Sequence, residues 1–420
     1  MTRLRPGLNG LMFVLSALAA GCGGGGTDHG STQTASAAES SPADRTRARP
    51  AQDEGDRRAF NHGIEAVQGA DGRWRIFFSS SGLPPTGPDD SGAWQHDVYV
   101  SSWGPEDARI SAPHVLIRKP EAQEPVSAAR TDNGHVMLSF EDGWNSDSEV
   151  SQRYAIYDEE LQPVAPYPQD VEPGGHSGHV AATADKFVVF YSDGWINGGG
   201  VDDLGTGNGV YAKVYDTHGR LLHDINVAHA QREWWPMVAA SPRRALLVWQ
   251  RYVPGELHAR LRVAVLDPET GELSGWRTLE NRLQYYTYKA QYIPALRRFL
   301  VVGTTVDGHG FAHLLDEQGR PRASLPCMPA TVREAGIAVR DRVAYTPAAD
   351  QRLMHLALGP SSIALVGVQP SPLAWSYTGS LGLVRDPWHL HWVSLTPSGV
   401  EEAEFELAQA VPPSDQDLCR

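Results

Sequence analysis

One recurring pattern constrains the fold of this 420-residue chain more than any other feature. It is clearest between Lys186 and Val227, where an apolar run ends in a long Gly/Asp-rich loop. An alternating run follows, closes with Asp216 and the turn Thr217–Gly219, and leads into another short run. Alternation separated by Gly and Asp turns predicts three strands of a four-stranded antiparallel meander.

The same pattern returns about every sixty residues, which is the sequence signature of a repeat architecture. Each copy has a short strand, a tight turn, an apolar run, a variable gap and an alternating strand, and no stretch has a convincing helical period. The six apolar runs are Arg75–Ser79, His135–Ser139, Lys186–Phe190, Arg244–Val248, Arg298–Val302 and Ser362–Val366.

Four-stranded units of this size cannot bury both faces of their sheets alone, and radial stacking solves this problem. The sequence therefore predicts an all-β chain with a six-bladed β-propeller over residues 58–410. A seven-bladed ring is the alternative, with the extra blade in 330–352 or 369–386. A β-sandwich is the third choice, and the even spacing disfavours it.

The repeat resembles those of secreted and surface propellers of bacteria. The resemblance rests on Phe187–Phe190, Asp193, Tyr211–Asp216 and Gly219, with a second copy at Leu246–Trp249. It implies architecture only, because the sialidase Asp-box, the WD dipeptide and the kelch Gly-Gly pair do not occur in repeated form.

The N-terminus has the features of a targeting signal. Arg3 and Arg5 precede an apolar stretch, Leu8–Ala20, and the segment Leu18–Cys22 resembles the lipobox of bacterial lipoproteins. The resemblance implies a signal peptide over 1–21 and a lipid on Cys22, which would hold the protein on the cell envelope. Gly23 after this cysteine favours the outer membrane by the same resemblance. An ordinary secretory signal with a chance cysteine is the alternative.

The segment 22–57 is rich in Gly, Ser and Ala and predicts a flexible tether, and 411–420 predicts a polar C-terminal tail. The net charge of −14 at pH 7 disfavours a nucleic-acid partner, and we expect a monomer.

Cys327 and Cys419 remain once Cys22 is acylated, and an oxidising compartment favours a disulfide between them. Two separate thiols are the alternative.

Aromatic and acidic residues gather in the loops and in the connections between predicted blades. Indole and phenol rings beside carboxylates suit sugar rings, which stack through their C–H faces. The alternative is that the tryptophans are packing wedges between blades. The candidate ligand-binding residues are Asp142, Trp144, Asp193, Trp195, Trp234, Trp235 and Tyr286, with His62 and His179 near the predicted axis.

The loop that carries Asp193, Asp202 and Asp203 is also a weak candidate for a Ca²⁺ site. Its spacing does not match an EF-hand, and a solvated acidic loop is the alternative. The sequence predicts no other cofactor.

These features lead to a functional hypothesis of an envelope lipoprotein whose propeller binds a carbohydrate or protein ligand through the aromatic, acidic loops of one face. A glycan hydrolase or lyase with carboxylates or histidines near the central channel is the rival. A scaffold for envelope assembly is a third possibility.

Overall fold

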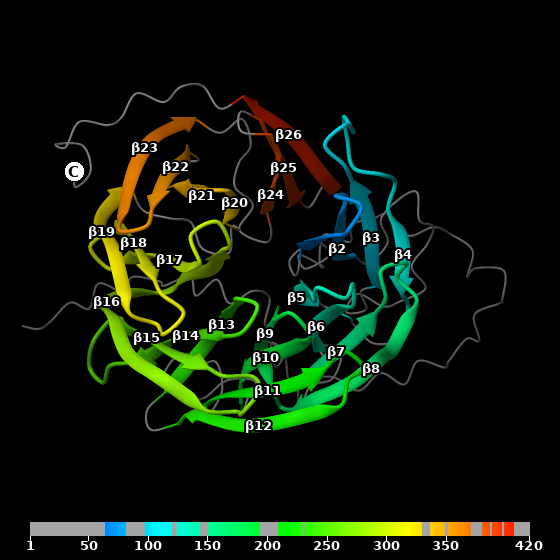
Figure 1. Cartoon of the computed structure of the whole chain (residues 1–420), viewed down its shortest axis with the longest axis horizontal. Coiled ribbons are helices and arrows are strands. Elements are labelled where there is room, and N and C mark those ends of the chain that lie inside the picture. Colours follow the sequence, from blue (N-terminus) through cyan, green and yellow to red (C-terminus); the bar gives the residue numbers. More distant parts are fainter. Residues whose placement is uncertain are drawn as a thin grey trace, which may run out of the picture.

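A computed structural model of the chain describes residues 64–80, 97–119, 123, 125–142, 150–193, 209–229, 232–329, 337–348, 352–370, 380–386, 389–396 and 399–406. These residues form twenty-six antiparallel strands and no helix, and therefore no helix that could cross a bilayer. The sheets are arranged radially around a central axis (Figure 1). The signal peptide, the tether and the C-terminal tail lie outside the described residues, so the domain boundaries stay predictions.

The first three blades are separate four-stranded sheets whose strands follow one another from the channel outward. Blade one consists of β1 (Glu65–Gln68), β2 (Trp74–Ser80), β3 (Asp97–Trp103) and β4 (His114–Ile117). Blade two consists of β5 (Pro125–Arg130), β6 (Val136–Asp142), β7 (Ser151–Tyr157) and β8 (Pro163–Pro173). Blade three consists of β9 (His176–Ala182), β10 (Lys186–Ser192), β11 (Val210–Asp216) and β12 (Leu221–Ala228).

Blades four and five share one long strand, β16, so that the two blades form a continuous seven-stranded sheet. The first half of β16 pairs with β15 as the outer strand of blade four, and its second half pairs with β17 as the inner strand of blade five. The strands are β13 (Glu233–Ala240), β14 (Ala245–Tyr252), β15 (Ala259–Leu266), β16 (Leu273–Ile293), β17 (Arg298–Thr305), β18 (His309–Leu315) and β19 (Pro321–Pro329).

Blade six has four strands and blade seven has three within the described residues. Blade six consists of β20 (Ala338–Arg340), β21 (Val343–Ala348), β22 (Arg352–Gly359) and β23 (Ser362–Pro370). Blade seven consists of β24 (Ser380–Asp386), β25 (His389–Thr396) and β26 (Gly399–Glu406).

The structure confirms the all-β propeller, and its described strands form seven blades, as in the alternative count rather than the six-bladed one. The run Ser362–Val366 was expected as a second strand but lies in β23, the outer strand of blade six. The inner pair of that blade, β20 and β21, lies in the 330–352 stretch. β20 has only three residues, and Pro347 lies in β21 beyond the residues that pair with β20, so the strand signal is weak there.

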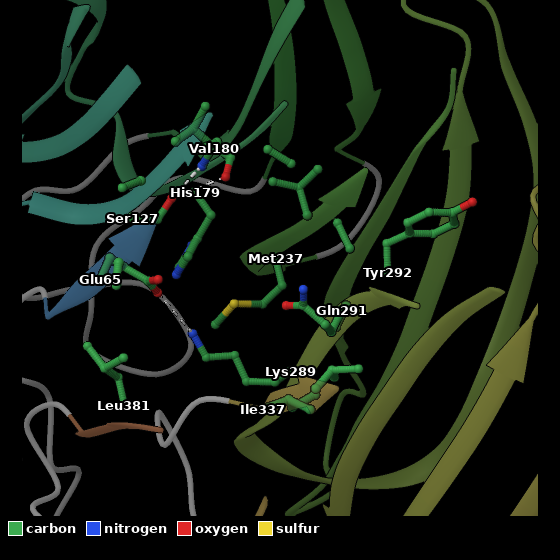
Figure 2. A pocket seen from close by; sticks show the side chains of 18 of the residues that line it. Glu65, Ser127, His179, Val180, Met237, Lys289, Gln291, Tyr292, Ile337 and Leu381 are labelled. Carbon is green, nitrogen blue, oxygen red and sulfur yellow. Dashed lines mark hydrogen bonds and ion pairs between the residues drawn. The ribbon is translucent and has the colours of Figure 1, made fainter. Parts of the chain in front are cut away.

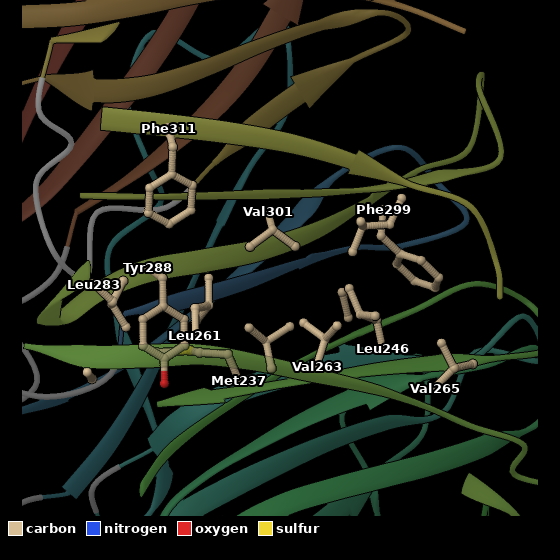
Figure 3. Close-up of a cluster of buried hydrophobic side chains, with 14 residues drawn as sticks. Met237, Leu246, Leu261, Val263, Val265, Leu283, Tyr288, Phe299, Val301 and Phe311 are labelled. Carbon is tan, nitrogen blue, oxygen red and sulfur yellow. The ribbon is translucent and has the colours of Figure 1, made fainter. Parts of the chain in front are cut away.

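Seven buried hydrophobic clusters hold the ring together, and each one fills the space between two neighbouring blades. Figure 3 shows the cluster between blades four and five, where Leu246 and Val263 face Phe299 and Val301. Both faces of a blade are covered by the next blade on each side. The second strands therefore carry apolar residues on both faces, which is why they are continuous apolar runs in the sequence.

The junction of blade seven with blade one closes the ring, and it combines ring stacking with polar contacts. His391 on β25 is 1% exposed and stacks on Trp103 of β3, with ring centroids 4.9 Å apart. Its Nε2 lies 2.8 Å from Glu402 Oε2, which also accepts a hydrogen bond of 2.8 Å from the backbone N–H of Ile110 in blade one.

Two further contacts of blade seven reinforce this junction. The second ring nitrogen of His391, Nδ1, lies 2.7 Å from Glu404 Oε1. Arg385 donates to the same carboxylate and to the backbone oxygens of Pro105 and Asp107 in blade one. The junction is thus a network of hydrogen bonds across two blades, in place of a strand shared between them in the described residues.

We predict that His391→Ala destabilises the protein by about 2 to 3 kcal/mol, because it removes the stack on Trp103 and leaves two carboxylates without their shared partner. The matched control is His389→Ala, two residues away on β25, whose side chain is 44% exposed. We expect a change within about 0.5 kcal/mol for the control. Urea unfolding followed by tryptophan fluorescence measures both, and equal losses would contradict the role given to the junction.

Candidate functional site at the mouth of the channel

The channel is a cavity of about 340 Å³, and all seven blades line it through their inner strands. Figure 2 shows Glu65, His179, Met237 and Lys289 around this space. Pockets that bind small ligands in proteins usually have volumes of about 300–1,000 Å³. The cavity is therefore large enough for a small ligand and too small for a folded partner.

One end of the channel, here called the mouth, lies where the inner strands begin. In blade three, His176 at the start of β9 pairs with Ser192 at the end of β10. In blade four, Glu233 at the start of β13 pairs with Arg251 near the end of β14. The loops that follow the second strands therefore leave the sheets at the mouth, which places Asp142 and Asp193 on this side.

Three neighbouring inner strands have a β-bulge at the same place near the mouth. Each bulge holds a non-glycine residue with a positive φ, and these residues are Ser177 (54°), Trp235 (58°) and Tyr286 (64°). Each stands two residues before an inner-strand residue that pairs again with the second strand. A bulge re-aims side chains, and strained backbone of this kind is concentrated at functional sites.

Glutamine side chains from the preceding blade hold two of these bulges. Gln152 on β7 accepts a 2.7 Å hydrogen bond from the N–H of Gly178, next to Ser177. Gln250 on β14 accepts a 3.0 Å hydrogen bond from the N–H of Tyr286. A Cβ at residue 178 would come within 2.2 Å of the Gln152 amide, so any larger residue there would displace this side chain. Each bulge conformation is therefore fixed by contacts with the neighbouring blade.

The bulges arrange aromatic rings in an arc around the mouth, across blades three to five. His176 stacks on Trp234 with centroids 5.7 Å apart, and Trp235 meets Tyr286 edge to face at 5.0 Å. Tyr285 lies against Tyr286 at 6.0 Å. Trp234 is buried, whereas Trp235, Tyr285 and Tyr286 are half-buried and keep ring surface open. We call these five residues the aromatic arc.

Charged groups support the buried side of the arc. The guanidinium of Arg232 lies 3.5 Å from the centre of the Trp234 ring. The Nε2 atom of His176 lies 3.4 Å from Glu141 Oε2, and both side chains are almost fully buried. The Ser177 hydroxyl contacts the other ring nitrogen of His176. These contacts fix the histidine ring against Trp234.

His179 lies further into the channel, two residues beyond Ser177 on β9. Its Nδ1 atom lies 2.9 Å from the backbone oxygen of Ser177. Burial, together with the nearby charge of Lys289, lowers the pKa of His179 to about 3. His179 is therefore a neutral side chain of the channel wall at neutral pH.

This lowered pKa makes the stability of the protein depend on pH. In the unfolded chain the imidazole takes up a proton below a pKa of about 6.5, whereas in the folded protein it stays neutral down to about 3. Stability is therefore complete above about pH 6.5 and falls as the pH drops towards 3. We predict a loss on the order of 2 kcal/mol between pH 6.5 and 4.5 that His179→Gln abolishes.

Urea unfolding at both pH values measures this effect. The buried His355, whose pKa burial lowers to about 4, remains in both proteins, so its contribution cancels in the comparison. An identical pH dependence in wild type and His179→Gln would contradict the assignment.

The structure brings four of the expected ligand-binding residues, Trp234, Trp235, Tyr286 and His179, to the mouth and the channel. Asp142 is buried at the end of β6, and Asp193 accepts hydrogen bonds from the Gly209 N–H at 2.8 Å and the Tyr211 hydroxyl at 3.2 Å. Asp193 thus closes the base of its loop. The other expected residues, His62, Trp144, Trp195, Asp202 and Asp203, lie outside the described residues.

The metal and disulfide hypotheses stay predictions. Within the described residues, no group of three or more His, Cys, Asp or Glu side chains could hold a metal ion. Cys327 lies on β19, but Cys419 lies outside the described residues, as does Cys22.

Sequence reasoning missed the channel pair Glu65 and Lys289, as well as the bulges. Glu65 stands in a short strand with only weak alternation, and Lys289 stands among tyrosines in the second half of β16. The residues next to Glu65 and Lys289 in the sequence do not indicate that these charged side chains face a channel. The repeated start of the inner strands, His-Ser-Gly-His, Trp-Trp-Pro-Met and Tyr-Tyr-Thr-Tyr, was a signal that an alignment of the blades could have used.

The chain matches no protein-family model and no curated protein sequence. Solved structures do resemble the chain. A lectin from Burkholderia pseudomallei superposes with a TM-score of 0.54 at 12% identity, over 84% of this chain and 98% of the lectin. An α-L-arabinanase from Penicillium chrysogenum, complexed with arabinobiose, has a TM-score of 0.49 at 10% identity, over 84% of this chain and 94% of the enzyme.

At 12% identity the likeness to the lectin shows a shared fold and nothing about the ligand. The chain is a β-propeller.

Proposed function

We propose that this protein is a lipid-anchored envelope protein whose propeller binds a carbohydrate at the mouth of its channel. The observation that carries the proposal is the aromatic arc, in which Trp235 and Tyr286 keep open ring surface beside a polar channel. Stacking of an aromatic ring on the C–H face of a sugar, combined with nearby polar groups for its hydroxyls, is a recurrent way to bind carbohydrates.

The backbone strain at the arc supports this proposal. A positive φ at a tryptophan or a tyrosine strains the backbone, and strained backbone of this kind is concentrated at functional sites. The two bulges that carry them turn neighbouring side chains towards each other, with ring centroids 5.0 Å apart. The fold is shared with a lectin, which is compatible with this use of the mouth.

The rival hypothesis of a glycan hydrolase has less support. Hydrolysis of a glycosidic bond usually requires two carboxyl groups that face each other across the substrate. Among the described residues that line the channel, Glu65 is the only carboxylate, and it faces the ammonium of Lys289. This arrangement favours binding over hydrolysis.

The location on the envelope rests on the lipobox-like segment Leu18–Cys22 and on the tether predicted for 22–57. A lipid on Cys22 and the predicted tether would let the mouth face soluble glycans or a neighbouring cell-wall layer. The anchor and the binding site are independent parts of the proposal.

We predict that the purified full-length protein binds members of a glycan array and that Trp235→Ala and Tyr286→Ala each weaken binding about tenfold or more, because each removes a stacking surface. Titration calorimetry with the best array ligand measures the change. The matched control is Trp276→Ala, which removes a 44% exposed tryptophan from the outer half of the same strand, β16. Equal losses in all three variants would contradict a site at the mouth.

We also predict that radiolabelled palmitate enters the full-length protein in cells and that Cys22→Ala abolishes labelling and moves the protein out of the membrane fraction. Cys419→Ala is the control and should keep both the label and the location. A wild-type protein that takes up no label would contradict the anchor while leaving the binding site untouched.

A further inference from the structure

The middle of the channel contains an ion pair that spans it. Glu65 on β1 of blade one and Lys289 on β16 of blade five reach towards each other, and the Lys289 ammonium lies 3.9 Å from Glu65 Oε1 (Figure 2). These blades are not neighbours in the ring, so the two side chains meet only in the channel. The pair lies below the mouth, because Lys289 follows Tyr286 by three residues along the inner strand.

The distance within this pair is longer than a hydrogen bond, for which heavy atoms approach to about 2.7–3.2 Å. The side chains are 20% and 31% exposed for Lys289 and Glu65, so both charges are largely withdrawn from bulk water while still facing the cavity. The carboxylate therefore keeps acceptor capacity, and the ammonium keeps donor capacity, towards a molecule in the channel.

The charges of the pair cancel. Of the other titratable residues in the wall, His179 is neutral at neutral pH, and the guanidinium of Arg130 is paired with Glu159. An anionic ligand would approach Glu65 as well as Lys289, and a cationic ligand would approach Lys289 as well as Glu65, so both would meet repulsion. A neutral ligand that can both donate and accept hydrogen bonds meets neither penalty.

The remaining wall provides the apolar part of a ligand site. Met237, Ile337 and Leu381 line the same cavity from three further blades. A pyranose has this combination of properties, since its ring carries hydroxyl groups at the edge and C–H groups on the face. The volume of about 340 Å³ suits one or two sugar residues.

We propose that the channel itself is a binding site for a neutral sugar, in which hydroxyl groups on one edge accept a hydrogen bond from Lys289 and donate one to Glu65. The inference rests on the proposed function, because the aromatic arc would hold the part of the glycan that lies outside. It adds the selectivity: the channel takes a neutral end unit of one or two residues and rejects acidic and basic sugars.

The test titrates the purified full-length protein with D-glucose, D-galactose, D-mannose and maltose as neutral probes, D-glucuronate as the acidic probe and D-glucosamine as the basic probe. Saturation-transfer NMR detects binding and calorimetry measures affinity. We expect at least one neutral probe to bind, at least tenfold more tightly than either charged probe. Lys289→Met and Glu65→Gln should each weaken this binding at least tenfold.

Lys186→Met is the matched control, because Lys186 pairs with Asp185 and Glu269 at the end of blade three opposite to the mouth and should leave binding unchanged. The exchange Glu65→Lys with Lys289→Glu keeps the pair but reverses it. Hydroxyl groups can reverse their roles, so binding should recover relative to the single variants. Melting temperatures of all variants show whether they remain folded.

The outcomes separate this inference from the proposed function. Neutral-sugar binding that depends on Trp235 and Tyr286 but not on Lys289 or Glu65 would overturn the channel site and leave the mouth site standing. Tighter binding of D-glucuronate or D-glucosamine would overturn the selectivity for neutral sugars. No binding to any probe, together with a blank glycan array, would overturn both proposals.

Discussion

The packing of one sheet against the next is the constraint on which the rest of this molecule depends. Each blade has apolar side chains on both faces, and each face is buried only by a neighbour, as Val188 and Val189 of one strand show by belonging to the cores on its two sides. No blade can bury its surface alone, so the ring must close. The contacts of His391 and Arg385 at the last junction therefore protect hydrophobic surface all around the ring.

The same constraint explains how much could be read from the sequence. Runs such as Lys186–Phe190 and Arg244–Val248 are apolar because they lie between two covered faces, and their regular spacing predicted the propeller. The count of blades was harder, because it depended on the inner pair of blade six. There a three-residue strand and Pro347 give little hydrophobic signal, and hydrogen bonding with β22 decides the structure.

The site was predictable in part, for a related reason. Tryptophans and tyrosines near blade starts pointed to the mouth, and in the doublet Trp234–Trp235 one ring is buried and the other half-buried. The bulges at Ser177 and Tyr286 are held by glutamines in the preceding blade, which are distant in sequence. A contact across blades, such as that between Glu65 and Lys289, is fixed only when the ring closes, so local sequence cannot reveal it.

The shared strand β16 has a mechanical consequence. Its outer half forms the edge of blade four, and its inner half carries Tyr286 and Lys289 to the channel, without an intervening loop in which displacement could be absorbed. Blades four and five are therefore joined by one continuous strand. A force on the outer edge of blade four would therefore be transmitted along an unbroken backbone to the channel wall. Among the described strands, only β16 couples the outer edge of the ring to its centre in this way.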